Sequence, residues 1–160
     1  MILSSRSQGA PAQGHREGAE PVDEDAWLDL HGLHPAGADL DEVRRLLREH
    51  IRRERRSQGD GDTALMKLCC VQLFHAGALD DVPLVWDAKT ASFDADCSID
   101  VQLLCGGGLD RTKRYLLSRR TTDGAADAAL RRLLACEQAA DFEDFTVERR
   151  SAWYTAYYGS

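Results

Sequence analysis

Apolar residues gather most densely between Thr63 and Phe93, where their spacing predicts two helices joined by a tight turn. The first helix is apolar nearly all round from residue 65 to 74, so we expect it to lie in the middle of the fold. Gly77 suits the left-handed position that ends this helix, and Pro83 falls in the first turn of the second. The short connection makes the two helices antiparallel neighbours.

The same periodicity predicts further helices on both sides of this pair. A long helix should start near Asp39 or Asp41, where a carboxylate can cap free N–H groups, and run to about Arg56. Two more are expected at about 110–120 and 125–139. Near the C-terminus, four aromatic residues recur at helical spacing, namely Trp153, Tyr154, Tyr157 and Tyr158.

The segment from Cys97 to Cys105 fits two interpretations. Ile99, Val101 and Leu103 alternate with polar residues as in a strand, yet the apolar residues also share one helical face. With helices on both sides and no other convincing strand, we interpret the segment as a buried helix. The glycines at 106–108 then interrupt the chain.

The chain divides into an N-terminal arm and one domain. Residues 1–25 are mostly Gly, Ala, Gln, Ser, Pro and charged residues, too polar to offset the entropy of ordering, and we expect a disordered arm. Order should begin at Trp27. Residues 26–160 are predicted to form a single all-α domain of about six helices in successive antiparallel hairpins, as a helical bundle or a short solenoid-like array.

Two resemblances agree with this fold. The pattern Leu73-Phe74-x-x-Gly77-x-Leu79-Asp80-Asp81-x-x-x-Val85-Trp86 resembles the join inside a tetratricopeptide-type hairpin, but no second copy recurs at a fixed period. The run from Leu65 to Asp110, with Cys136-Glu137 and Asp141-Phe142, resembles a group of small actinobacterial proteins without assigned chemistry. That resemblance implies a bacterial, cytosolic, helical protein and nothing about mechanism.

The net charge and the cysteine content limit which classes of partner and which cellular compartment we expect. A net charge of −7 argues against a nucleic-acid or anionic-membrane surface and favours a basic partner. The five cysteines do not form the spaced framework of a secreted disulfide scaffold. No apolar leader follows Met1, and no run is long enough to span a bilayer. We therefore expect a cytoplasmic protein with no membrane contact.

One stretch matches a catalytic pattern. Cys105, Arg111 and Thr112 have the Cys-x5-Arg-Ser/Thr spacing of cysteine-dependent phosphatases, and the Leu-Asp-Arg-Thr ending resembles the phosphoinositide-phosphatase version. The resemblance implies a thiolate nucleophile, an arginine that grips phosphate and a threonine that stabilises the leaving thiolate. However, Leu104 stands where those enzymes usually place histidine, and neither strands nor a general acid can be assigned. We therefore prefer a structural interpretation, in which a buried cysteine precedes a Gly-rich turn.

The sequence predicts no metal site and no cofactor. The pair His31-x-x-His34 lies in a loop, the cysteines are scattered, and adjacent Cys69 and Cys70 should point to different sides of a helix. A cysteine–histidine nucleophilic pair that uses His50 or His75 stays open, because sequence gives no distance between the groups.

Two surfaces are candidates for partner binding. The C-terminal aromatic residues could clamp the last helix onto the core or face a partner. Arg48 and Arg52 belong to an arginine-rich helix face that is either solvated or docks an acidic partner, RNA included. Our leading hypothesis is a non-catalytic, cytosolic protein–protein interaction module, such as an inhibitor or immunity-like partner of a basic protein. The alternative is the phosphatase-like enzyme, and nucleic-acid binding ranks last.

Overall fold

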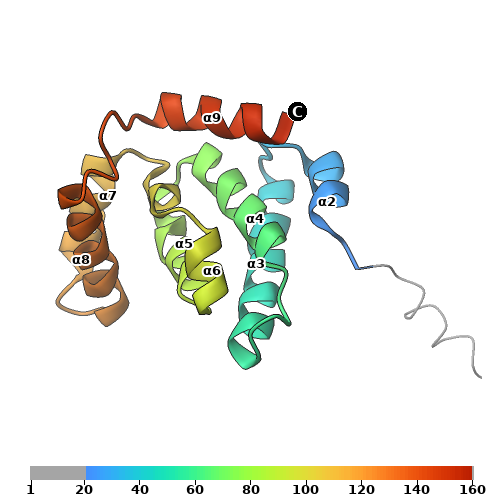
Figure 1. Cartoon of the computed structure of the whole chain (residues 1–160), viewed down its shortest axis with the longest axis horizontal. Coiled ribbons are helices and arrows are strands. Elements are labelled where there is room, and N and C mark those ends of the chain that lie inside the picture. The colour runs from blue at the N-terminus through green and yellow to red at the C-terminus, as the bar shows by residue number, and fades with distance from the viewer. Residues whose placement is uncertain (1–20, 160) are drawn as a thin grey trace, which may run out of the picture.

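The computed structural model describes residues 21–159, which form eight α-helices, two 3₁₀ helices and no strand (Figure 1). The predicted all-α fold is confirmed, although the count exceeds the expected six. The elements are α2 (Glu24–His31), α3 (Ala38–Arg56), α4 (Thr63–Ala76), η1 (Leu79–Asp81), α5 (Val82–Lys89), α6 (Phe93–Ser98), η2 (Val101–Cys105), α7 (Leu109–Arg119), α8 (Gly124–Gln138) and α9 (Val147–Gly159).

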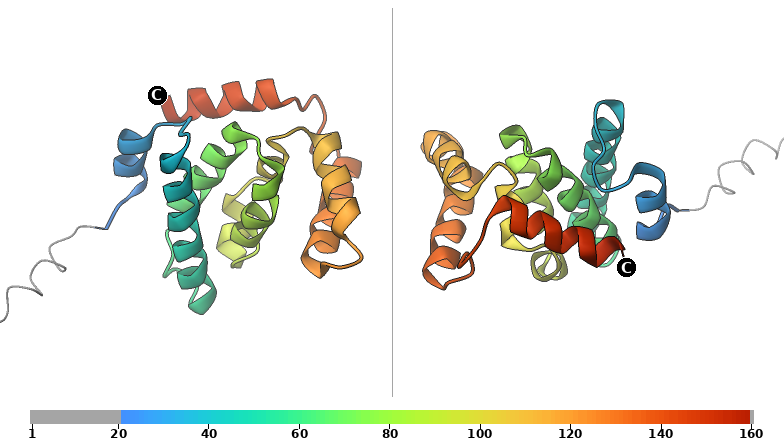
Figure 2. Two further views of the ribbon diagram at one scale, coloured as in Figure 1. Left: turned by 180° about the vertical axis from the view of Figure 1, so that it is seen from behind. Right: turned by 90° about the horizontal axis from the view of Figure 1, so that it is seen from above.

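The helices stand in successive pairs, as the hairpin prediction required. The pairs α3/α4, α5/α6 and α7/α8 lie side by side, and α9 crosses one end of the row (Figures 1 and 2). The first 20 residues of the predicted arm lie outside the described residues. Order begins earlier than expected, because Asp23 caps α2 by accepting a hydrogen bond from Ala26 N at 2.9 Å.

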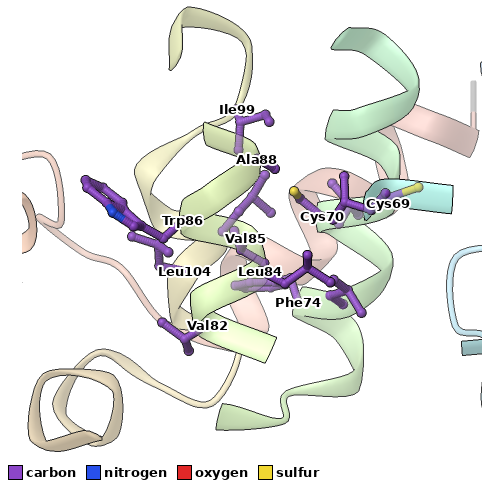
Figure 3. Close-up of a cluster of buried hydrophobic side chains, with 14 of the residues drawn as sticks. Cys69, Cys70, Phe74, Val82, Leu84, Val85, Trp86, Ala88, Ile99 and Leu104 are labelled. Carbon is purple, nitrogen blue, oxygen red and sulfur yellow. The ribbon is translucent and has the colours of Figure 1, made fainter. Parts of the chain in front are cut away.

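Helix α4 occupies the centre of the fold. Every residue from Leu65 to Phe74 except Lys67 is buried, and α4 contacts α2, α3, α5, α6 and η2. Cys69 and Cys70 point to opposite sides of α4, and Cys70 faces the apolar side chains of α5 (Figure 3). The helix ends at Gly77 with φ +71°, the left-handed conformation predicted for that position.

Buried polar groups on α4 and α5 attach their neighbours at fixed points. The Trp27 indole donates to Gln72 Oε1 at 3.0 Å, and Gln72 Nε2 donates to Gly32 O at 2.7 Å, so α2 is fixed to α4. On α5, the Lys89 ammonium donates to Ile99 O at 2.6 Å and contacts Asp96 Oδ1 at 2.9 Å. Such groups are costly to bury unless paired, and these pairings therefore fix the register of the helices.

The prediction of one buried helix over Cys97–Cys105 is wrong in shape, and its burial is confirmed for Ile99 and residues 101–105 but not for Cys97, which is exposed. Helix α6 ends at Ser98, Asp100 is extended with ψ +141°, and η2 then begins. The helix can end here because the Lys89 ammonium donates a hydrogen bond to the Ile99 carbonyl oxygen. All residues of η2 are buried.

Two histidines make the stability of the fold depend on pH. His50 Nδ1 accepts a hydrogen bond from Asp62 N at 3.1 Å, an arrangement that requires an unprotonated nitrogen. The His75 ring stacks on His34 with centroids 4.2 Å apart and donates from Nδ1 to Leu33 O at 2.8 Å. Burial lowers the pKa of both His50 and His75 below 6.5, and nearby Arg53 adds to the effect at His50.

We expect the free energy of unfolding to fall as pH drops from about 7.5 to about 5, because the unfolded chain binds protons at both histidines before the folded protein does. This stability is fully present above the unfolded pKa and is lost below it. Asp96, whose pKa the Arg132 guanidinium lowers to about 2, acts in a separate window at lower pH. Urea titrations at several pH values measure the slope. The variant His50→Asn/His75→Asn should flatten it, and an unchanged slope in that variant would contradict the assignment.

Candidate functional site

Helix α9 is attached to the fold by its inner face. Tyr154 is completely buried, its ring meets Phe74 edge-on with centroids 6.1 Å apart, and its hydroxyl donates to Asp100 Oδ2 at 2.6 Å. Burial, followed by the neighbouring Asp100 carboxylate, raises the pKa of Tyr154 far above its usual range, so this hydroxyl keeps its proton. Tyr158, one turn further on, is half-buried against the core. These two tyrosines clamp the helix onto α4 and the loop before η2.

The exposed flank of α9, about 100° around the helix axis from the inner face, carries the other two aromatic residues. Trp153 and Tyr157 are 50% and 55% exposed, and their rings stack with centroids 5.7 Å apart and planes 8° from parallel. The Arg150 guanidinium lies 5.5 Å from the Trp153 ring, and Lys67 Nζ lies 5.3 Å from the Tyr157 ring. We call Trp153 and Tyr157 the aromatic strip. A cation at each end of the strip holds the pair in a fixed, exposed arrangement.

A cleft opens beside Trp153, between α9 and the segment that leads into it. We call residues 139–146 the connector. Its aromatic rings Phe142 and Phe145 meet edge to face with centroids 5.3 Å apart, and Phe142 is buried. The cleft is lined by Asp141, Glu143, Asp144, Phe145, Thr146, Arg149, Arg150 and Trp153. The connector is therefore anchored by its aromatic side chains while its carboxylates face the cleft side of the molecule.

The arginine face of α3 is separate from the aromatic strip. Helix α3 begins near the C-terminal end of α9 and runs away from it (Figure 1). At 1.5 Å per residue, Arg48 lies about 15 Å along the α3 axis from Ala38. Arg52 pairs with Glu49 on the same helix, whereas Arg48 is exposed and makes no ion pair among the described residues. The structure thus brings Trp153 and Tyr157 together but not Arg48 and Arg52 with them.

The segment that resembles a phosphatase loop is packed rather than open. Cys105 is completely buried, and burial raises the pKa of its thiol to about 12. Thr112 Oγ1 donates to Gly108 O at 2.8 Å, and Arg111 is exposed. A Cβ atom at Gly106 would lie 2.3 Å from Phe74 O. The glycines thus allow close backbone packing onto the end of α4, which supports the structural interpretation of this turn.

The remaining nucleophile and ligand candidates are occupied or dispersed. All five cysteines are free, and burial raises the pKa of Cys69 and Cys70 well above the usual thiol range. His50 and His75 are hydrogen-bonded to backbone groups. Within residues 21–159, no three His, Cys, Asp or Glu side chains are grouped so that they could hold a metal ion.

Comparisons with known proteins give this chain no relative. No known family, curated protein or solved structure matches it. Among the described helices, none is both long and apolar enough to cross a bilayer. The surface of the molecule itself is therefore the basis for inferring its function.

The sequence pointed to α9 but not to all of its functional surroundings. Two pairs at four-residue spacing, 153/157 and 154/158, indicate two parallel stripes on one helix. That signal could have shown that the pairs have different roles. The contribution of Lys67 comes from α4, 90 residues before Tyr157, and no local pattern could have revealed it.

We expect Gly106→Ala to destabilise the protein by about 2 kcal/mol or more, because the new Cβ would overlap backbone atoms that cannot rotate away. Gly124→Ala is the matched control, since nothing lies within 4 Å of its Cβ position at the start of α8. Urea unfolding compares the two variants. Equal free energies of unfolding would show that the turn does not need its glycine for packing.

The connector contains an alanine whose backbone conformation is unfavourable for that residue type. Ala140 has φ +70°, a left-handed conformation that costs an alanine about 1 kcal/mol. We expect Ala140→Gly to stabilise the protein by about 0.5 kcal/mol, after the added flexibility of the unfolded chain is subtracted. Ala135→Gly, an exposed site inside α8, should instead destabilise it by about 0.5–1 kcal/mol. Thermal unfolding of both variants measures the sign, and destabilisation by Ala140→Gly would contradict the prediction.

Proposed function

We propose that this protein is a non-catalytic protein-binding module of the bacterial cytosol that docks its partner on the exposed flank of α9. The observation that carries the proposal is the exposure of the stacked rings of Trp153 and Tyr157 on a helix whose inner face is firmly anchored. An inhibitor or immunity-like protein is one form that such a module takes.

The aromatic strip has to change little in conformation when a partner binds. Each aromatic ring can bury about 150–250 Å² in an interface, and half of each ring is still exposed here. The rings are held by each other, by Arg150 and by Lys67, so little side-chain entropy is lost when a partner covers them. Tryptophan and tyrosine held in this way are the residues that most often dominate binding energy.

Other features support a cytosolic location and oppose the alternative function, a phosphatase-like enzyme. Free cysteines, three of them buried, suit a reducing cytosol. The net charge of −7 disfavours nucleic acid as the partner and favours a basic protein. A phosphatase-like role for Cys105, Arg111 and Thr112 would need an accessible thiolate, whereas burial keeps this thiol protonated at neutral pH.

The test compares point variants rather than a truncation, because removal of α9 would expose the surface beneath Tyr154. Tagged wild-type protein, Trp153→Ala/Tyr157→Ala and Phe93→Ala are used to capture proteins from a lysate of the native source, with quantification by mass spectrometry. Phe93 is an exposed aromatic residue, 75% accessible, on α6. We expect the double variant to lose at least about tenfold of the specific partner, as befits a hot-spot pair, and Phe93→Ala to retain it.

Circular dichroism checks that the variants keep their fold. If a folded double variant captures the same proteins in the same amounts as the wild type, α9 is not the binding surface. If Phe93→Ala abolishes capture instead, the surface lies on α6.

A further inference from the structure

We propose that the segment docking on α9 is basic, with an arginine or lysine side chain that enters the cleft between Trp153 and the connector. This inference rests on the proposed function and specifies the chemistry of the partner. It starts from charges that the fold itself leaves without counter-ions.

The connector carries carboxylates that remain unpaired. Asp141, Glu143 and Asp144 line the cleft, and none of them forms an ion pair with any of residues 21–159. By contrast, two carboxylates that join helices are paired: Arg44 binds Asp81 through two nitrogens, at 2.8 and 3.0 Å, and Arg132 binds Asp96 likewise, at 3.0 and 3.1 Å. The connector is thus an acidic edge available to a partner.

Two guanidinium groups also line the cleft, and they do not cancel this charge. Arg150 lies 5.5 Å from the Trp153 ring and 5.8 Å from the Tyr154 ring, so these rings position its guanidinium, which keeps its positive charge. Arg149 and Arg150 together supply two positive charges against three carboxylates, which leaves one net negative charge. The cleft therefore has an excess of negative charge, in a protein whose net charge of −7 attracts basic partners over long range.

The aromatic strip and the acidic edge together define the shape of the partner segment. Arg150 and Lys67 lie beside the rings of the stack, so a partner meets the exposed portions of Trp153 and Tyr157 with an apolar side chain. One basic residue beside that apolar contact reaches the connector carboxylates. A guanidinium suits this place because its planar fork pairs with carboxylates in a bidentate manner.

The test distinguishes two questions: whether the aromatic strip binds a partner at all, and whether that partner is basic or acidic. Lysate proteins are divided at pH 7 into a cation-exchange-retained basic fraction and an anion-exchange-retained acidic fraction, and each is offered to immobilised protein. The informative variant is Glu143→Lys/Asp144→Asn, in which asparagine tolerates the left-handed backbone of residue 144, where φ is +60°. Asp60→Lys/Asp94→Asn changes the net charge equally, using exposed residues of the α3–α4 loop and α6.

We expect capture from the basic fraction that depends on Trp153 and Tyr157. It should fall about tenfold or more in Glu143→Lys/Asp144→Asn, rise in Arg149→Glu and change less than about twofold in the Asp60/Asp94 control. Capture from the acidic fraction, capture of this chain itself, or stronger capture by Glu143→Lys/Asp144→Asn would overturn the proposal of a basic segment. Absence of strip-dependent capture from both fractions would instead refute the proposed function.

Discussion

The burial of α4 on nearly every side is the constraint on which the rest of the structure depends. A helix with an apolar surface all round must be covered by several neighbours, and here α2, α3, α5, α6 and η2 supply that cover. Two of its polar side chains then determine where α2 and the loop after it sit. Gln72 fixes α2 through two hydrogen bonds, and His75 holds the Leu33 carbonyl of the following loop. Apolar burial provides the driving force, and these few polar contacts provide the register.

The same helix explains why both described ends of the chain are ordered. The indole of Trp27 reaches Gln72 of α4 from the N-terminal side, and the ring of Tyr154 reaches Phe74 from the C-terminal side. Each contact combines a large ring with one hydrogen bond to a buried or half-buried acceptor. The terminal helices α2 and α9 are therefore attached through a few anchoring residues, and most of the surface of α9 stays available to solvent.

Periodicity predicted the long helices well because their apolar stripes correspond directly to what is buried, as in α3 and α8. It failed at Cys97–Cys105, where the conformation depends on a Lys89 ammonium ten residues before Ile99. At the candidate site, the residue types and spacing of the aromatic tail were visible in the sequence. Which stripe faces the core was not, because that choice depends on Asp100 and Phe74, which lie far away along the chain.

A peripheral helix can bind a partner and stay attached to the core only if the residues that anchor it differ from the residues that face the partner. In α9 the separation falls between adjacent residues: Tyr154 is sequestered with its hydroxyl on Asp100, while Trp153 stays half exposed. Because the anchoring and exposed residues alternate along the helix, a partner can cover Trp153 and Tyr157 without displacing Tyr154. In the proposed complex, binding would add to the cover of α9 instead of competing with the core, and the fold would be the same with and without a partner.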